Sequence, residues 1–357
     1  MNTEQCNISV YNEIVGRAME LKHPLDVMWE LTYRCNLECK HCYITPGNGI
    51  EISTEKGFDL LQQLADAGVL WLTFSGGEPF LRADIFELLE RARSLNFAVM
   101  LFTNGTLIGQ AEAKRLASLK LSGVEVSIYG ASPVIHDAFT GIEGSFEKTM
   151  AGIKYMLALG VPVTLKTCIV RSNMEDMTKM EELCNNLGVR FRMTSYLAPQ
   201  NDGDTTKVDK HRLTDYQLEK LYREDGFSDD NDEIVYPDLQ MNDQKDIIPC
   251  SAGHITCGIT PDGRILPCPQ FVNGGDSIFE NDFLSIWRNS EYLQKIREIR
   301  LSDVEICNRC PGLKYCFRCQ GIALIEDGDL LGPSSEACRN TRIFMRLIGN
   351  EAQVPPA

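Results

Sequence analysis

The sequence predicts an α/β protein with a parallel sheet, followed by a smaller cysteine-rich domain. From residue 26 to about residue 195, short apolar runs of strand length alternate with amphipathic helix patterns. A series of about six β/α units implies a parallel sheet, either an open doubly wound sheet or a partial (β/α)6 barrel. Eight of the 14 cysteines lie between residues 250 and 338, in a segment with few long helix patterns. Metal clusters would supply the stability that such a segment cannot obtain from an apolar core.

The expected elements alternate along the first part of the chain. Strands are expected at residues 26–31, 69–74, 98–102, 123–128 and 161–170, and helices at 54–67, 84–95, 111–119, 145–159 and 173–187. In the helix at 84–95, Asp84 is a candidate N-cap, and Ile85 and Leu88 share one apolar face. Sites in such folds lie at the carboxyl ends of the strands, so residues that follow a strand are the candidates.

The periodicity fades between residues 198 and 246, where an acidic run at 225–233 has the composition of a connector. The chain therefore divides into five parts. They are an N-terminal extension at 1–24, the α/β core at 25–197, an acidic connector at 198–246, the cysteine-rich domain at 247–345 and a tail at 346–357.

Composition limits the classes of function. The net charge of −15 argues against nucleic acid as the main partner, because phosphate binding needs clustered Lys and Arg. The chain has no long apolar run and its first residues lack signal-peptide features, so we expect a cytoplasmic protein without a membrane partner. In the reducing cytosol, 14 cysteines indicate metal binding rather than disulfides. Cys6, Cys168 and Cys184 stand apart and are expected to act as small hydrophobic residues.

The strongest signal is the triplet Cys35-x3-Cys39-x2-Cys42, which follows the first expected strand. Three thiolates this close together can hold three irons of a cubane cluster and leave the fourth iron without a protein ligand. Such an open iron can bind and reduce a small molecule, which a fully ligated electron carrier cannot do. The triplet therefore predicts an enzyme.

A second signal lies at the end of the second expected strand, in Gly76-Gly77-Glu78-Pro79. Two glycines let a ligand approach the backbone closely, and Glu78 offers a carboxylate that suits an ammonium group. Taken alone, the same residues also suit an ordinary strand-to-helix turn. The cysteine triplet one strand earlier favours a binding site.

Together the two motifs resemble the radical S-adenosylmethionine (SAM) superfamily, over about residues 25–195. The resemblance implies a partial (β/α)6 TIM-like barrel in which the triplet holds a 4Fe–4S cluster. It also implies that Gly76, Gly77 and Glu78 contact the methionyl amine of SAM, whose amino and carboxylate groups chelate the open iron. Reduction by one electron then cleaves SAM to methionine and a 5′-deoxyadenosyl radical, which abstracts hydrogen from a substrate.

The resemblance extends to further cofactor contacts. Tyr43 is expected to border the adenine, and Ser127 resembles the serine of an S-I-D-G segment that contacts the cofactor. Tyr129 stands here where that segment has aspartate. Asn104 follows the third strand and either faces the same cavity or makes a turn. Lys166 is a candidate for the cofactor carboxylate, although another role is favoured for it.

The eight C-terminal cysteines are the third signal, because their number completes two four-ligand sites. Zinc ribbons are the structural alternative, since zinc also takes four cysteines. The pattern resembles the SPASM extension of radical SAM enzymes, which binds two auxiliary 4Fe–4S clusters. By position, the first auxiliary set is Cys250, Cys257, Cys268 and Cys319, and the second is Cys307, Cys310, Cys316 and Cys338. The commonest form of the motif has one residue more than this chain between Cys316 and Cys319.

SPASM enzymes mostly modify peptides or proteins, so the resemblance implies oxidative modification of a peptide, as in maturases of ribosomally synthesised peptides. Residues 127–132 and 144–146 also look like peptide maturases. Side-chain modification of a tetrapyrrole, as in haem-pathway relatives, is the alternative, and a non-catalytic iron–sulfur electron carrier is a third hypothesis. Sulfatase maturation is disfavoured, because Pro269-Gln270 follows Cys268 where those enzymes have aspartate.

The implied partners are the peptide and an electron donor such as flavodoxin or ferredoxin. Only about 25 residues precede the first strand, too few for a peptide-recognition domain with its own core, so a separate leader-recognition protein is expected. No catalytic acid or base can be chosen from the sequence. The polar candidates near strand ends or cluster ligands are Glu125, Tyr196, His254 and Gln270.

Overall fold

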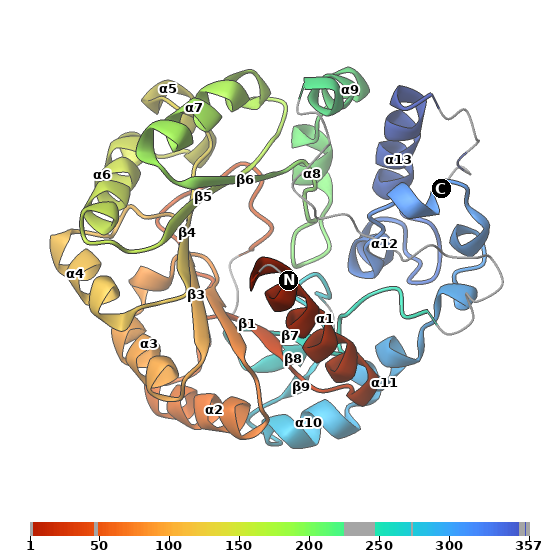
Figure 1. The fold of residues 1–357 in the computed structure, drawn as a ribbon, viewed down its shortest axis with the longest axis horizontal. Helices are drawn as coiled ribbons and strands as arrows, with labels where there is room; N and C mark the ends of the chain where they lie inside the picture. The colour runs from red at the N-terminus through yellow and green to blue at the C-terminus, as the bar shows by residue number, and fades with distance from the viewer. Residues whose placement is uncertain (1–2, 46–48, 225–246, 273, 350–353, 355–357) are drawn as a thin grey trace.

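The computed structural model describes all residues except 1–2, 46–48, 225–246, 273, 350–353 and 355–357 (Figure 1). Its described residues form a sheet with the strand order β6-β5-β4-β3-β2-β1-β7-β8-β9. The first six strands are parallel: β1 (Asp26–Glu30), β2 (Trp71–Ser75), β3 (Ala98–Thr103), β4 (Gly123–Ser127), β5 (Val163–Cys168) and β6 (Arg190–Thr194). Their order in space is their order in sequence. The predicted partial barrel is confirmed, and the doubly wound alternative is wrong because the order of these six strands does not reverse.

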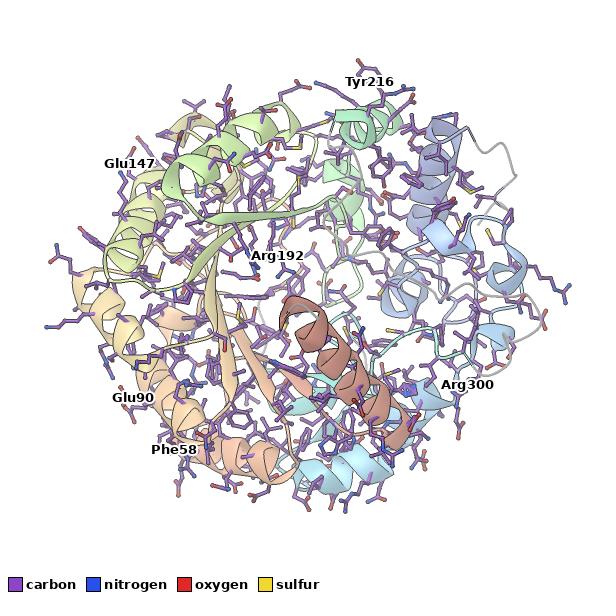
Figure 2. The ribbon with its side chains drawn as sticks, in the orientation of Figure 1. Phe58, Glu90, Glu147, Arg192, Tyr216 and Arg300 are labelled. Atoms are coloured by element: carbon purple, nitrogen blue, oxygen red, sulfur yellow. The ribbon has the colours of Figure 1, made fainter. Side chains whose placement is uncertain are left out.

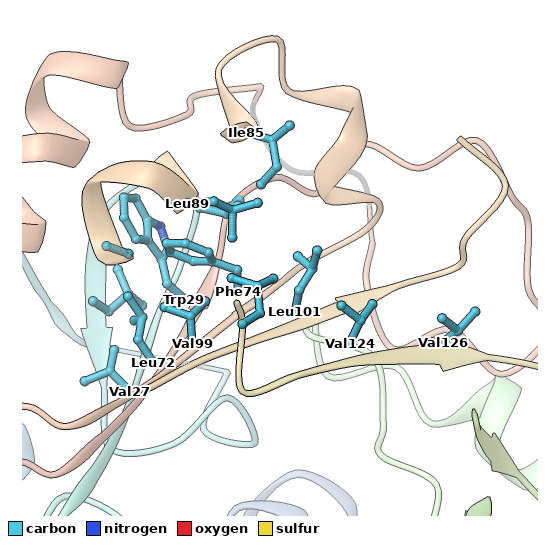
Figure 3. Packing of buried hydrophobic residues seen from close by; sticks show 14 of the residues in the cluster. Val27, Trp29, Leu72, Phe74, Ile85, Leu89, Val99, Leu101, Val124 and Val126 are labelled. Carbon is cyan, nitrogen blue, oxygen red and sulfur yellow. The ribbon is translucent and has the colours of Figure 1, made fainter. Parts of the chain in front are cut away.

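The predicted helices are confirmed and lie outside the curved sheet (Figure 1). They are α2 (Thr54–Asp66), α3 (Ile85–Ser94), α4 (Gln110–Leu119), α6 (Ser145–Ala158) and α7 (Met177–Leu187). Alternate strand residues pack beneath them, among them Val27 and Trp29, which are fully buried (Figure 3). Trp29 lies so close to α2 that a Cβ on Gly57 would come within 3.1 Å of the indole ring.

The cysteine-rich region continues the same sheet. β7 (Thr256–Ile259) pairs parallel with β1, and β8 (Arg264–Leu266) and β9 (Asp276–Ser277) follow in antiparallel pairing. Its helices are α10 (Phe283–Asn289), α11 (Glu291–Glu298), α12 (Gln320–Glu326) and α13 (Ser335–Leu347). Short 3-10 helices lie at Leu301–Asp303, Cys307–Arg309 and Leu313–Tyr315 here, and at Pro79–Leu81 and Met174–Asp176 in the barrel. Because β7 pairs with β1, this region lies beside the strand that leads to the cysteine triplet.

Outside the cysteine-rich region, four of the described helices were not expected from the sequence: α1 (Thr3–Leu21), α5 (Pro133–Thr140), α8 (Thr206–His211) and α9 (Asp215–Glu224). α8 and α9 fall in the expected connector, yet they bury Val208, Leu218 and Leu221. α8 has only six residues, too few for an apolar period to stand out among charged residues. The acidic run at 225–233 lies outside the described residues. None of the described helices has both the length and the apolar composition needed to cross a bilayer.

A buried ion network joins α8 and α9 to the C-terminal helices. Arg212, directly after α8, pairs with Glu326 of α12 and lies 3.8 Å from Glu336 of α13. Arg339 of α13 reaches Asp215 of α9 at 2.6 Å. Removal of one partner from a buried ion pair is strongly destabilising, because it leaves an uncompensated buried charge. The network therefore holds α8 and α9, which lie in the expected connector, against α12 and α13 of the cysteine-rich region.

Replacing Arg212 with methionine should lower the free energy of unfolding by about 3 kcal/mol, because the buried carboxylate of Glu326 loses its cation, whereas Glu336 keeps Arg339. Chemical denaturation followed by circular dichroism measures this loss. Arg346→Met is the matched control, since it removes an exposed ion pair with Glu219 and should leave the transition in place. Equal transitions for Arg212→Met and the wild type would show that the network does not stabilise the fold.

Candidate functional site

The loop after β1 places its three cysteines on one cavity of about 730 Å³. Cys35, Cys39 and Cys42 all line this cavity, together with Gly77 from the loop after β2. The turn between β7 and β8 supplies another part of the wall, including Asp262. The structure thus brings the two strongest sequence motifs together and adds a wall from the cysteine-rich region.

The cysteine loop is held by α5, one of the helices that the sequence analysis missed. The backbone N–H of Glu38 donates to the carbonyl of Thr140 at 2.8 Å. The N–H of Lys40 donates to the carbonyl of Phe139 at 3.1 Å. These bonds fix the path of the loop between its first and last cysteines through the protein's own backbone.

The three thiols suit a cluster better than a single metal ion. Burial raises the pKa of each thiol, and the charges of Cys42 and Cys35 raise the pKa of Cys39 further. Thiolates held together in such a pocket need a positive counter-charge, which iron supplies. Within the described ranges, no three His, Cys, Asp or Glu side chains are grouped closely enough to hold one ion. Zinc requires its thiolates at about 2.3 Å from one centre, whereas a cubane spreads its ligands over separate irons.

Two glycines bring the loop after β2 against the cysteine loop. The N–H of Gly77 donates to the carbonyl of Thr32 at 2.7 Å, and the N–H of Glu78 donates to that of Arg34 at 2.9 Å. A Cβ on Gly77 would lie 2.7 Å from the carbonyl carbon of Arg34 and closer still to its oxygen. Gly76 has a φ of 127°, which favours glycine. Among the described residues, neither glycine carbonyl accepts a hydrogen bond, so both are available to an ammonium group.

Glu78 is fully buried and bonded to the end of β3. Its carboxylate accepts hydrogen bonds from the hydroxyl of Thr103 and from the N–H of Asn104, each at 2.8 Å. Burial raises the pKa of Glu78 to about 7. Asn104 in turn donates to Asn36 at 2.9 Å and lies 3.9 Å from the sulfur of Cys35, so it faces the cysteine loop. Glu78 therefore organises the site, and its contact with an amine stays a prediction.

A buried carboxylate that the sequence analysis missed lies at the end of β1. Glu30 accepts hydrogen bonds from the hydroxyls of Tyr43 and Tyr33, the latter at 3.2 Å. Burial raises the pKa of Glu30. After burial, the Glu30 charge also contributes to the raised pKa of both Cys42 and Cys268. Glu30 is therefore close to the cysteine loop and to the first auxiliary set. The feature of the sequence that could have identified Glu30 is its position as an acidic residue at the end of an apolar strand.

Aromatic rings pack beneath the cysteine loop. The ring of His41 lies 5.0 Å from that of Tyr129 and 5.1 Å from that of Phe139, and Tyr129 stacks on Phe139 at 4.3 Å. Burial lowers the pKa of His41 to about 4, so the imidazole is neutral. Ser127 makes a hydrogen bond with Tyr129. Cys168 packs in the same apolar cluster, as expected for a small hydrophobic residue.

A charged group lies inside the barrel. The amine of Lys166 is 3.4 Å from the carboxylate of Glu125, and Arg192 approaches the same carboxylate at 2.9 Å. Figure 2 shows Arg192 within the ring of strands. The amine also lies 3.0 Å from the ring centre of Phe102. Burial lowers the pKa of Lys166 to about 8. Lys166 stands opposite Ser127 in the β4–β5 register, so the two predicted cofactor contacts share one level of the barrel.

The C-terminal cysteines fall into two groups. All members of the second predicted set line one small cavity: Cys307, Cys310, Cys316 and Cys338. In the first set, the charges of Cys319 and Cys250 add to burial in raising the pKa of Cys268. Cys257 instead lies on β7 opposite Val27, in the main apolar core. Burial and the charge of Asp26 are the main causes that raise the pKa of Cys257. Of the other cysteines in the first set, only Cys268 contributes to that raised pKa.

The polar candidates for acid or base catalysis lie away from the cysteine loop. Tyr196 is buried, and the charge of Cys316 adds to burial in raising its pKa. His254 lies near Arg297, and burial lowers its pKa to about 4. Neither of these side chains, nor Glu125 or Gln270, is among the described residues that line the cavity. The structure therefore selects no catalytic acid or base from the predicted candidates.

Lys166 should make folding stability depend on pH. Its pKa is about 8 in the folded protein and about 10.4 in an unfolded chain, so the folded protein binds fewer protons between these values. Stability should therefore rise with pH across that window. Relative to Lys166→Met, which keeps the stem of the side chain, the wild type should gain up to about 3 kcal/mol from pH 7 to pH 10. Urea denaturation of both proteins at both pH values measures the difference, and parallel pH profiles would contradict a desolvated lysine.

Known proteins share both parts of this chain. Residues 29–184 match the radical SAM superfamily, and residues 250–311 match SPASM, an iron–sulfur cluster-binding domain. The AdoMet-dependent heme synthase of Methanosarcina barkeri is 29% identical over 86% of this chain and 94% of its own. The PqqA peptide cyclase of Rhizobium meliloti is 30% identical over 87% of this chain and 86% of its own. The crystal structure of Streptococcus suis SuiB bound to precursor peptide SuiA has the same fold, with a TM-score of 0.69 and 20% identity over 95% of this chain and 82% of that one.

Proposed function

Because the chain belongs to the radical SAM superfamily and has a SPASM domain, we propose that this enzyme oxidatively modifies a peptide by abstracting hydrogen from it. The observation that supports the proposal most directly is the shared cavity. The cysteine triplet, Gly77 and Asp262 of the SPASM domain all line it. A substrate in this cavity would contact the barrel and the SPASM domain at once.

SAM and 4Fe–4S clusters are the cofactors of this enzyme, and its residues fit them. We propose that the triplet holds the SAM-binding cluster and that the carbonyls of Gly76 and Gly77 accept the SAM amine. Ser127 and Lys166 would contact the carboxylate, and Tyr43 would border the adenine. When bound, the cluster and SAM supply the radical that abstracts hydrogen. The chain itself would orient them and keep the carboxylates of Glu30 and Glu78 out of water.

The nature of the substrate rests on the compared proteins and on the shared cavity. The peptide cyclase is named for a peptide, and SuiB was crystallised with a precursor peptide. The heme synthase, at a similar identity, favours the tetrapyrrole alternative. A peptide fits a cavity that is lined by two domains better than a tetrapyrrole does, because a peptide chain can extend beyond the cavity. We further propose a cytoplasmic location, a flavodoxin or ferredoxin as reductant, and a separate leader-recognition protein.

Iron content tests the cluster assignment. We expect about twelve irons per chain after anaerobic reconstitution, since each cubane holds four. Replacing Cys35, Cys39 and Cys42 with alanine should remove about four of them and leave the auxiliary clusters in place. Elemental analysis with electron paramagnetic resonance of the reduced protein measures both quantities. About four irons with about two zincs in the wild type would mean that the C-terminal cysteines form zinc sites.

The function is tested by anaerobic incubation with SAM, dithionite and precursor peptides encoded beside the gene. We expect 5′-deoxyadenosine, together with a change in peptide mass that requires both SAM and reductant. The variant without the cysteine triplet is the control and should give neither product. Turnover of a carboxylated tetrapyrrole with no change in any peptide would overturn the proposal in favour of the alternative. Mass spectrometry distinguishes these outcomes.

A further inference from the structure

Cationic side chains gather beside the cavity, although the net charge of the chain is −15. We call this group the basic patch, and its members are Lys40, Arg171, Lys207, Lys210 and His211. Lys40 belongs to the cysteine loop, Arg171 follows β5, and the remaining members lie on α8. Lys40 and Lys207 line the cavity itself. The patch therefore extends from the cavity onto the surface of α8.

The members of the patch are close enough to act on one another. Besides burial, the charges of Lys210, Lys40, Arg171 and Lys207 all lower the pKa of His211. Four cations thus lie within electrostatic range of one side chain. Like charges in such proximity repel, and an anionic ligand would relieve that repulsion.

The protein offers the patch little compensating charge. Across the described residues, the three lysines of the patch have no carboxylate within ion-pair distance. The nearby acids have other partners. Asp209 lies 3.7 Å from Arg212, and Asp204 accepts a hydrogen bond from the N–H of Thr206 at 2.8 Å. Asp204 does feel the charge of Lys207, Asp209 is exposed on α8, and Glu38 lines the cavity with Lys40, but these carboxylates are fewer than the four cations.

We propose that the basic patch binds acidic side chains of the peptide substrate, in the stretch that flanks the modified residue. This inference rests on the proposed function, because it specifies the chemistry of that peptide. Lys207 lines the cavity, whereas Lys210 and Arg171 do not. A small molecule held in the cavity would reach only part of the patch, while an extended chain can enter the cavity and continue along α8. Carboxylates are the anions that such a chain supplies to lysine and arginine side chains.

Binding of labelled peptides to the holoenzyme tests the patch. Three unstructured probes share one sequence except at alternate positions, which are Asp and Glu, Asn and Gln, or Lys. The wild type should bind the acidic probe at least tenfold more tightly than the amide probe, and added salt should weaken that preference. Lys207→Glu/Lys210→Glu should lose the preference and bind the lysine probe better than the wild type does. Damage to folding would not produce such a reversal. Fluorescence anisotropy measures all of these affinities.

Lys114→Glu/Lys154→Glu is the matched control, because it makes the same change of charge on α4 and α6 and should bind like the wild type. Equal affinity of the wild type for the three probes would overturn the proposal, as would equal losses in the two double variants. If the patch variant instead slows reduction by flavodoxin and keeps its preference for the acidic probe, the patch is a reductase site and the proposal is wrong. Since these readouts are affinities, they are independent of the mass change that tests the proposed function.

Discussion

The contact on which the site depends is the approach of Gly77 to the carbonyl of Arg34. Parallel pairing of β1 with β2 brings Glu30 opposite Ser75, so the loops after the two strands leave the sheet at one edge. Only a residue without a Cβ lets these loops touch. The glycines are thus needed for the packing of one loop on the other, as well as for the approach of a ligand. The same contact places Gly77 on the cavity that the three cysteines line.

A second constraint comes from β7, which extends the barrel sheet on the other side of β1. The SPASM domain is therefore built onto the catalytic sheet, and the turn after β7 becomes part of the cavity wall. The same strand explains the position of Cys257. Neighbouring residues on a strand point to opposite faces, and Cys257 shares the face of Val27 that is covered by helices. Cys257 thus packs in the main core, whereas Cys250 and Cys268, which lie outside β7, pack against a different apolar cluster.

The sequence was enough to predict the barrel because its evidence is local. Apolar runs and amphipathic periods identify the β/α units, and parallel strands then place the triplet and the glycines at one edge. What could not be predicted depends on tertiary contacts. The eight residues of α5 are too few to show a period, although they hold the cysteine loop. Glu30 has a defined role only because the loop after β1 folds back to bring two phenols to it. Lys166 has one because the neighbouring strands bring a carboxylate and a ring to its amine. Likewise, Lys207 and Lys210 of α8 form the basic patch only together with Lys40, which is far away in sequence.

The distribution of charge around the cavity links these features. The thiols of the triplet line it, the buried carboxylate of Glu30 lies close to them, and burial makes the ionisation of these groups costly. A cationic pair, Lys166 and Arg192, lies on the inner side within the barrel, and the basic patch lies on the side of α8. Binding of iron must release protons from the thiols, because only thiolates ligate it. Under the proposed binding modes, the carboxylate of the cofactor would be attracted to the inner side of the barrel, and the acidic residues of the peptide to the side of α8.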